Sequence, residues 1–126
     1  MPLSHPIVGV VLGAGGVRGS AHAAVMKTLH EADIPIHLVV GASTGALYGL
    51  GLAAGMPVEE LARLARAATP RDLRRFYLGR LRPSRTNPIG RLLLEAGTGK
   101  QFSDLDLPFA VTATDILTGE QVVLDT

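Results

Sequence analysis

The stretch Val39-Val40-Gly41-Ala42-Ser43-Thr44-Gly45-Ala46 decides which fold the sequence predicts. A β-branched run ends in glycine, a serine follows one residue later, and a helical pattern begins at once. This is G-x-S-x-G between a strand and a helix, the sequence form of a nucleophile elbow. On so tight a turn the positions of Gly41 and Gly45 have no room for a side chain, and the strained backbone holds Ser43 Oγ out of the turn. A plain glycine-rich turn between a core strand and a core helix is the alternative, because the pattern alone is weak.

A second glycine-rich stretch lies upstream. The apolar run 7–12 is typical of a parallel strand buried on both faces, and Gly13-Ala14-Gly15-Gly16-Val17-Arg18-Gly19 follows it directly. A helical pattern then covers 20–32, and a second strand is expected over 36–40. Strand, helix and strand at this spacing form a right-handed βαβ unit. Both glycine turns should therefore lie side by side at the carboxyl edge of one sheet.

The rest of the pattern completes one α/β domain with a mainly parallel sheet. The helix after Ser43 is apolar nearly all round, which predicts burial. We find no internal repeat and no linker. In order, we expect helices over 44–54, 57–68 and 89–96, a short helix and surface loop over 69–88, and paired strands over 109–116 and 120–124.

Composition bounds the classes of function. With 126 residues, 47% hydrophobic and 18% charged, the chain can bury roughly two-thirds of its unfolded surface as a globular domain. It has no cysteine, which excludes disulfides, Cys-zinc sites and thiol catalysis. The N-terminal residues lack the basic region and apolar core of a signal peptide, and no apolar run is long enough to span a bilayer. We expect a cytoplasmic protein.

Charge is unevenly distributed. Between residues 61 and 94 a single acid, Asp72, stands among nine arginines, at positions 63, 66, 71, 74, 75, 80, 82, 85 and 91. Such a region favours anionic lipid head groups or phosphate and predicts peripheral contact with a membrane, although a solvated surface has the same composition. Phe76 and Tyr77 are its only aromatic residues, which is too few for a stacking surface that binds nucleic acid.

The two glycine turns together suit acyl transfer. A serine that attacks an ester forms an oxyanion, and losing one backbone N–H donor to it costs about 3–4 kcal/mol. Gly15 and Gly16 are the best candidates for these donors, because glycine lets the backbone approach closely. Arg18 would brace the loop or meet an anionic head group, unless it is a surface arginine packed on the helix.

A dinucleotide site is the competing use of the first turn. The G-x-G-x-x-G pattern needs glycine at positions 13, 15 and 18, but position 18 is arginine. The acid expected after the second strand is replaced by Gly41-Ala42-Ser43, and the Gly-Lys-Ser/Thr of a phosphate-binding loop is absent. A nucleotide-binding domain is therefore the weakest of the alternatives.

A conventional triad cannot be assembled. In α/β-hydrolases the order along the chain is serine, acid and histidine. All four histidines precede Ser43, at positions 5, 22, 30 and 37. His22 is expected to pack or to form a hydrogen bond near the glycine loop. A serine with a carboxylate base is the remaining route.

The motifs Gly15-Gly16-Val17-Arg18-Gly19-Ser20-Ala21-His22 and Gly41-Ala42-Ser43-Thr44-Gly45 resemble the bacterial branch of the patatin-like phospholipases. The strand pair 109–125 resembles the family's Ala-Thr-Asp…Thr-Gly pair. The resemblance implies a three-layer α/β/α fold, a Ser–Asp dyad without histidine, and action on acyl esters of phospholipids and other lipids. It makes Ser43 the nucleophile and the Gly15 and Gly16 amides the oxyanion hole. Arg18, Gly41 and Gly45 have supporting roles, and no metal or cofactor is needed.

Two departures from the family pattern qualify the resemblance. Ala14 replaces the opening glycine of G-G-G-x-R-G, and the chain contains no Asp-Gly, the motif that carries the dyad aspartate. Asp115 belongs to the strand pair of the family pattern, and Asp125 is the residue directly before Thr126, so neither is taken as the base. The sequence resembles the N-terminal part of a patatin-like domain, incomplete over 1–126.

Two interpretations of the activity follow from these departures: a lipid acyl hydrolase, and a non-catalytic relative that binds lipid or a protein partner. A sheet without its last strands would also leave an unpaired edge, which predicts self-association.

Overall fold

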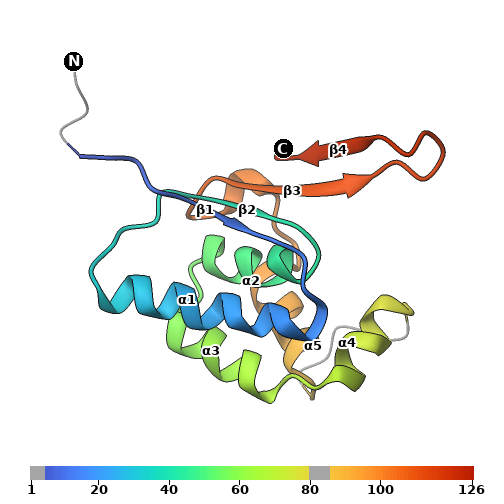
Figure 1. The fold of residues 1–126 in the computed structure, drawn as a ribbon, viewed down its shortest axis with the longest axis horizontal. Coiled ribbons are helices and arrows are strands. Elements are labelled where there is room, and N and C mark those ends of the chain that lie inside the picture. The colour runs from blue at the N-terminus through green and yellow to red at the C-terminus, as the bar shows by residue number, and fades with distance from the viewer. Residues whose placement is uncertain (1–4, 80–85) are drawn as a thin grey trace.

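The computed structural model describes residues 5–79 and 86–126. Within these residues the chain forms four strands and five α-helices (Figure 1), with short 3₁₀ and π turns between them. The elements are β1 (Gly9–Leu12), η1 (Gly16–Gly19), α1 (Ser20–Glu31), β2 (Leu38–Gly41), α2 (Thr44–Ala53), α3 (Val58–Ala67), α4 (Pro70–Tyr77), α5 (Pro88–Leu92), η2 (Leu93–Gly97), η3 (Phe102–Asp104), β3 (Phe109–Thr114) and β4 (Gln121–Leu124). Strand and helix alternate as far as α2, three further helices follow, and β3 and β4 are the last two elements.

The sheet has the order β1-β2-β3-β4. β1, β2 and β3 are parallel, and β4 returns antiparallel to β3 as the second strand of a hairpin. Leu12 pairs with Gly41, and Gly41 pairs with Val111. The expected mainly parallel sheet is therefore confirmed, and the first two strands end at the same edge.

Helices α1 to α5 lie on one face of the sheet (Figure 1). Leu12, Val39 and Phe109 point to this face and are buried. Val11 points to the opposite face and is 78% exposed. The resemblance predicted three layers, and the part of the chain that the structure describes forms two of them, the sheet and one helical layer.

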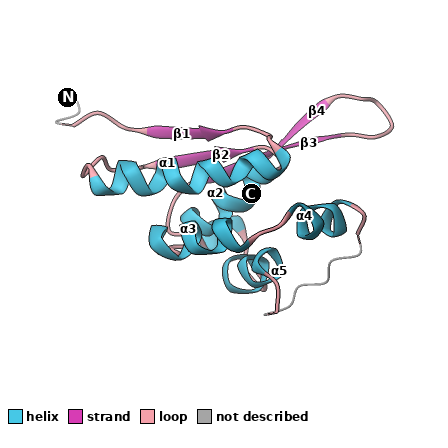
Figure 2. Cartoon of the chain, turned by 60° about the horizontal axis from the view of Figure 1, so that its bottom comes forward, coloured by secondary structure: helices cyan, strands magenta, loops and turns pink. Residues whose placement is uncertain are grey.

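Helix α2 lies at the centre of the core. Six of its ten residues are buried, as its apolar composition predicted: Thr44, Gly45, Tyr48, Gly49, Gly51 and Ala53. Helix α3 presents Leu61 and Leu64 to the same core and keeps Arg63 in solvent. Figure 2 shows that the β3–β4 hairpin extends beyond the helical layer, and the side chains of Ile116 and Leu117 at its tip are exposed.

Helix boundaries follow local chemistry that hydrophobic periodicity does not capture. The short helix expected within 69–88 is α4, which begins with a capping box between Thr69 and Asp72. The expected helix 89–96 begins one residue earlier, where Asn87 caps it by accepting a hydrogen bond from Gly90 N at 2.5 Å. It then passes into a π turn, Leu93–Gly97.

None of the helices in the described part of the chain is long and apolar enough to cross a membrane. Residues 80, 82 and 85 of the arginine-rich region lie outside the described residues.

Candidate active site

Ser43 lies on a strained turn between β2 and α2. Its backbone has φ 53° and ψ −124°, a conformation that residues with a side chain rarely adopt, and its side chain is exposed. The carbonyl oxygen of Ser43 accepts hydrogen bonds from Ala46 N at 2.9 Å and Leu47 N at 3.3 Å, which begin α2. This is the backbone geometry that the pattern around Ser43 predicted.

The glycines on either side of Ser43 are required by close contacts. A Cβ atom at Gly41 would lie 2.5 Å from Ala46 Cα. A Cβ atom at Gly45 would collide with the carbonyl groups of Leu12 and Gly13. Real Cβ atoms do not approach other atoms so closely, so neither position accepts a side chain without a shift of the backbone.

These contacts also join the two glycine turns. Ala42 N donates a hydrogen bond to Leu12 O at 3.0 Å, so the residue before Ser43 is bonded to the end of β1. The loop that starts at Gly13 is therefore in direct contact with the start of α2. The expected side-by-side placement of the two turns is confirmed.

Thr44 forms a further contact between the turns, which the sequence alone did not indicate. Its side chain is 1% exposed and packs against Gly19, where a Cβ atom would collide with it. Among the described residues Thr44 Oγ1 has no hydrogen-bond partner. Burial of such a hydroxyl costs free energy of folding. We infer that Thr44 is kept here because its side chain packs against the glycine loop and helps to hold that loop beside the elbow. The sequence carries no signal for this contact, because it joins residues of two different turns.

Gly15 and Gly16 form the bend of the first loop. Gly15 O accepts a hydrogen bond from Arg18 N at 3.0 Å, and η1 begins at Gly16. Gly16 has φ +55°, and a Cβ atom there would meet nothing within 4 Å. Glycine is therefore favoured by the backbone conformation at this position and not by a lack of room for a side chain. The role of these two amides as an oxyanion hole stays a prediction.

His22 anchors the same loop. Its Nε2 lies 2.7 Å from Gly13 O. Because a carbonyl oxygen only accepts, Nε2 carries the proton and donates it. That nitrogen is not free to act as a base, and a hydrogen-bonding role was the expectation for His22. Arg18 is exposed on η1 beside this loop.

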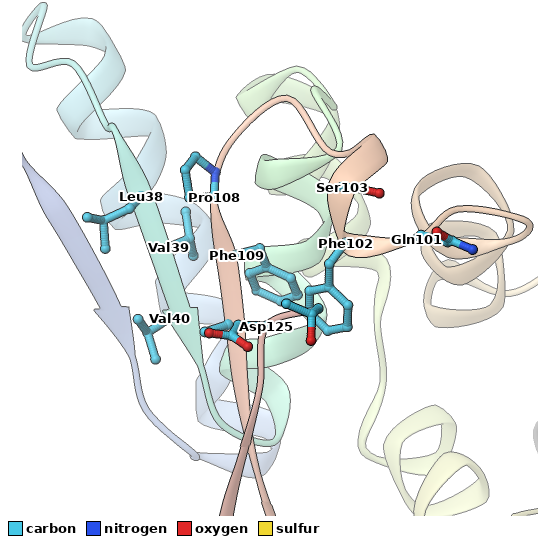
Figure 3. Close-up of a pocket in the computed structure, with 11 residues that line it drawn as sticks. Leu38, Val39, Val40, Gln101, Phe102, Ser103, Pro108, Phe109 and Asp125 are labelled. Atoms are coloured by element: carbon cyan, nitrogen blue, oxygen red, sulfur yellow. The ribbon is translucent and has the colours of Figure 1, made fainter.

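Asp115 and Asp125, the two aspartates of the strand pair that are not taken as the base, have other surroundings. Asp115 Oδ1 accepts hydrogen bonds from Leu117 N at 2.8 Å and Thr118 N at 3.1 Å, which shape the β3–β4 turn. Asp125 lines a hollow of about 830 Å³ with Leu38 and Pro108 (Figure 3). This hollow lies at the amino-terminal ends of β2 and β3, so it is at the opposite end of the strands from Ser43.

Two of the described arginines in the arginine-rich region, Arg63 and Arg91, contact Glu60. Glu60 Oε2 accepts a hydrogen bond from Arg63 Nε at 2.8 Å, and Arg91 lies 3.3 Å from Glu60 Oε1. The hydrogen bond from Arg63 lowers the pKa of Glu60, and Arg91 adds to this effect. Four other arginines on or beside α3 and α4 are exposed: Arg66, Arg71, Arg74 and Arg75.

Within residues 5–79 and 86–126, no group of three histidine or carboxylate side chains is arranged to hold a metal ion.

Glycine at position 43 should relieve the backbone strain. We expect Ser43→Gly to have a higher free energy of unfolding than Ser43→Ala by roughly 1–3 kcal/mol. The reason is that the backbone conformation at position 43 is strained for alanine and unstrained for glycine. Urea denaturation of the two variants measures the difference. Ser103 lies in η3 without a positive φ, so there glycine should be less stable than alanine by roughly 0.5–1 kcal/mol. The same order of stability at both positions would show that Ser43 is not strained.

Comparison with known proteins identifies the family to which the chain belongs. The family model described as patatin-like phospholipase matches residues 10–120. Proteins named "Uncharacterized NTE family protein" from Mycobacterium tuberculosis and Mycobacterium bovis are 33% identical over 126 aligned residues, which cover 94% of this chain and 34% of theirs. The chain thus spans about a third of the length of these relatives.

A shorter match of higher identity is found in an animal protein. The "Neuropathy target esterase sws" of Drosophila virilis is 55% identical over 42 residues, which are 33% of this chain and 3% of that protein. The family match covers both glycine turns, Ser43 and strand β3, and it ends before β4. The chain belongs to the patatin-like phospholipase family.

Proposed function

We propose that this chain carries the nucleophile of a serine acyl hydrolase that cleaves acyl esters of phospholipids or other lipids. The observation that supports the proposal most is the backbone of Ser43, which is strained on a tight turn directly beside a glycine loop. Strain of this kind is kept where it serves a function. The family and the esterase name of a relative support the same class of reaction.

In the proposed reaction Ser43 Oγ attacks the ester carbonyl carbon, and the carbonyl π electrons move onto oxygen. The N–H groups of Gly15 and Gly16 stabilise this oxyanion, together with the amino-terminal end of α2. Collapse of the intermediate breaks the bond to the alcohol, which leaves with a proton, and an acyl-serine remains. Water then attacks the acyl-serine, and the fatty acid and the free serine are released.

The proton of Ser43 passes to a carboxylate base in this scheme. The family resemblance places that base in an Asp-Gly motif, which the 126 residues do not contain. Asp115 is engaged in the hairpin turn, and Asp125 lies in the hollow at the other end of the strands. The base is therefore the one component of the mechanism for which this chain offers no candidate, and a non-catalytic relative that binds lipid is the alternative.

Labelling with a fluorophosphonate tests the proposal. We expect the wild-type chain to be labelled and Ser43→Ala not to be labelled, because Ser43 Oγ is the proposed nucleophile and the amides of the glycine loop would stabilise the phosphoryl oxygen of the reagent. Ser103→Ala is the matched control and should be labelled like the wild type. The readout is the mass of the modified protein.

Equal labelling of wild type and Ser43→Ala would contradict the proposal. If neither is labelled but the wild type binds anionic vesicles in a salt-sensitive way, the non-catalytic alternative is supported, with the exposed arginines of α3 and α4 as the contact surface. Binding of NAD(P) or ATP would instead support a nucleotide-binding domain.

The anchor at His22 predicts an effect on rate. His22→Ala removes the hydrogen bond to Gly13 O, which should loosen the oxyanion loop and slow fluorophosphonate labelling roughly two- to ten-fold. The initial rate of labelling is the measurement. His30→Ala is the control, because His30 is exposed on the same helix. Equal slowing by both substitutions would remove the special role of His22.

We also propose that the sheet edge at β4 mediates self-association. Val123 is 55% exposed on the edge strand of the described sheet. We expect wild type to associate with rising concentration in sedimentation velocity, and Val123→Lys to shift it toward monomer. Ile116→Lys, at the hairpin tip, should behave like wild type. A wild type that stays monomeric at high concentration would contradict the proposal.

A further inference from the structure

A second cavity, of about 290 Å³, lies between α2, β3 and the segment 97–105. Apart from Lys100 and Gln101, its lining consists of glycine and apolar side chains. The apolar side chains of this lining include those of Ala46, Leu47, Leu50, Phe102, Phe109 and Val111. We call this cavity the α2–β3 groove. An apolar groove of this size is suited to a hydrocarbon chain.

One end of the groove is at the elbow. Ala46 and Leu47 line it, and their N–H groups are the ones that donate to Ser43 O. Val111, on the opposite wall, pairs with Gly41, two residues before Ser43. A chain whose carbonyl carbon is at Ser43 can therefore enter the groove within one turn of α2.

The other end of the groove is closed by two aromatic rings. Phe102 and Phe109 stack with ring centroids 5.9 Å apart and an interplanar angle of 22°. Phe102 and Phe109 line the α2–β3 groove, and both also line the 830 Å³ hollow that Figure 3 shows. The aromatic pair is therefore the partition between the two cavities.

Of the two rings, Phe102 is the one that can be removed at low cost. Phe109 is buried in β3 and belongs to the main core. Phe102 is half-buried, lies on the three-residue helix η3 and packs against the core from outside. A substitution of Phe102 should therefore open the partition without loss of the fold.

We propose that the α2–β3 groove holds the acyl chain of the substrate and that Phe102 sets the longest chain it accepts. This inference rests on the proposed function, since it takes the ligand to be an acyl ester of Ser43. Each methylene that enters the groove should strengthen binding roughly four-fold. The gain should end where the chain reaches the aromatic pair.

The test measures binding of saturated fatty acids, from hexanoate to palmitate, by displacement of cis-parinaric acid from the full chain carrying Ser43→Ala. We expect affinity to rise with chain length and then to level off. Adding Phe102→Ala should move the levelling point to longer chains, because the groove then opens into the hollow. Adding Leu50→Phe should move it to shorter chains, because the larger ring fills the groove. Leu73→Ala, in the helical layer away from the groove, controls for general loosening.

The same levelling point in all variants would overturn the proposal. If thermal unfolding shows that Phe102→Ala does not fold, the shift in Leu50→Phe decides. Fluorophosphonate labelling of the serine-containing chain separates this inference from the proposed function. If the chain is labelled but the levelling points do not change, only the proposal about the groove is refuted. If the levelling points shift but the chain is not labelled, only the proposed hydrolase activity is refuted.

Discussion

The close contact between the start of α2 and the end of β1 is the constraint on which the site depends. It consists of the hydrogen bond from Ala42 N to Leu12 O and of the space that Gly45 leaves for the carbonyl groups of Leu12 and Gly13. Because β1 and β2 are parallel neighbours in register, the loop after β1 and the elbow after β2 emerge at one edge of the sheet. The contact joins the loop and the elbow at this edge, so Ser43 and the glycine loop are held beside each other.

Burial of α2 makes the strain at Ser43 sustainable. A residue with φ 53° and ψ −124° would relax if the segments on either side could rotate. Here β2 is held between two parallel strands, and α2 is buried on most of its circumference. The core thus supplies the free energy that keeps the elbow in shape, and the same burial places Thr44 against Gly19. The geometry of the site therefore depends on the stability of the helical layer.

Much of this arrangement could be predicted from sequence because it depends on local rules. Apolar runs with glycine after them identify parallel strands and their turns, and the spacing of G-x-S-x-G implies the strained serine. Thr44 could not be singled out, since its importance comes from a contact with Gly19 across the βαβ unit. The π turn of Leu93–Gly97 also escaped prediction, because it has the same apolar periodicity as an α-helix. The single helical layer is a matter of tertiary packing, on which periodicity is silent.

The α2–β3 groove is a further feature that could not be predicted from the sequence, and it bears on the proposed function. Phe102 and Phe109 are seven residues apart, and nothing in their spacing indicates that their rings stack or that cavities lie on both sides. The pairing arises because the segment 97–105 folds back along α2 before β3 begins. The strand that pairs with the elbow strand thus carries one wall of the groove, and the segment before it carries the partition. In the proposed function, the residues that carry out the chemistry come from the two glycine turns, whereas those that would select the chain length come mainly from a later part of the chain.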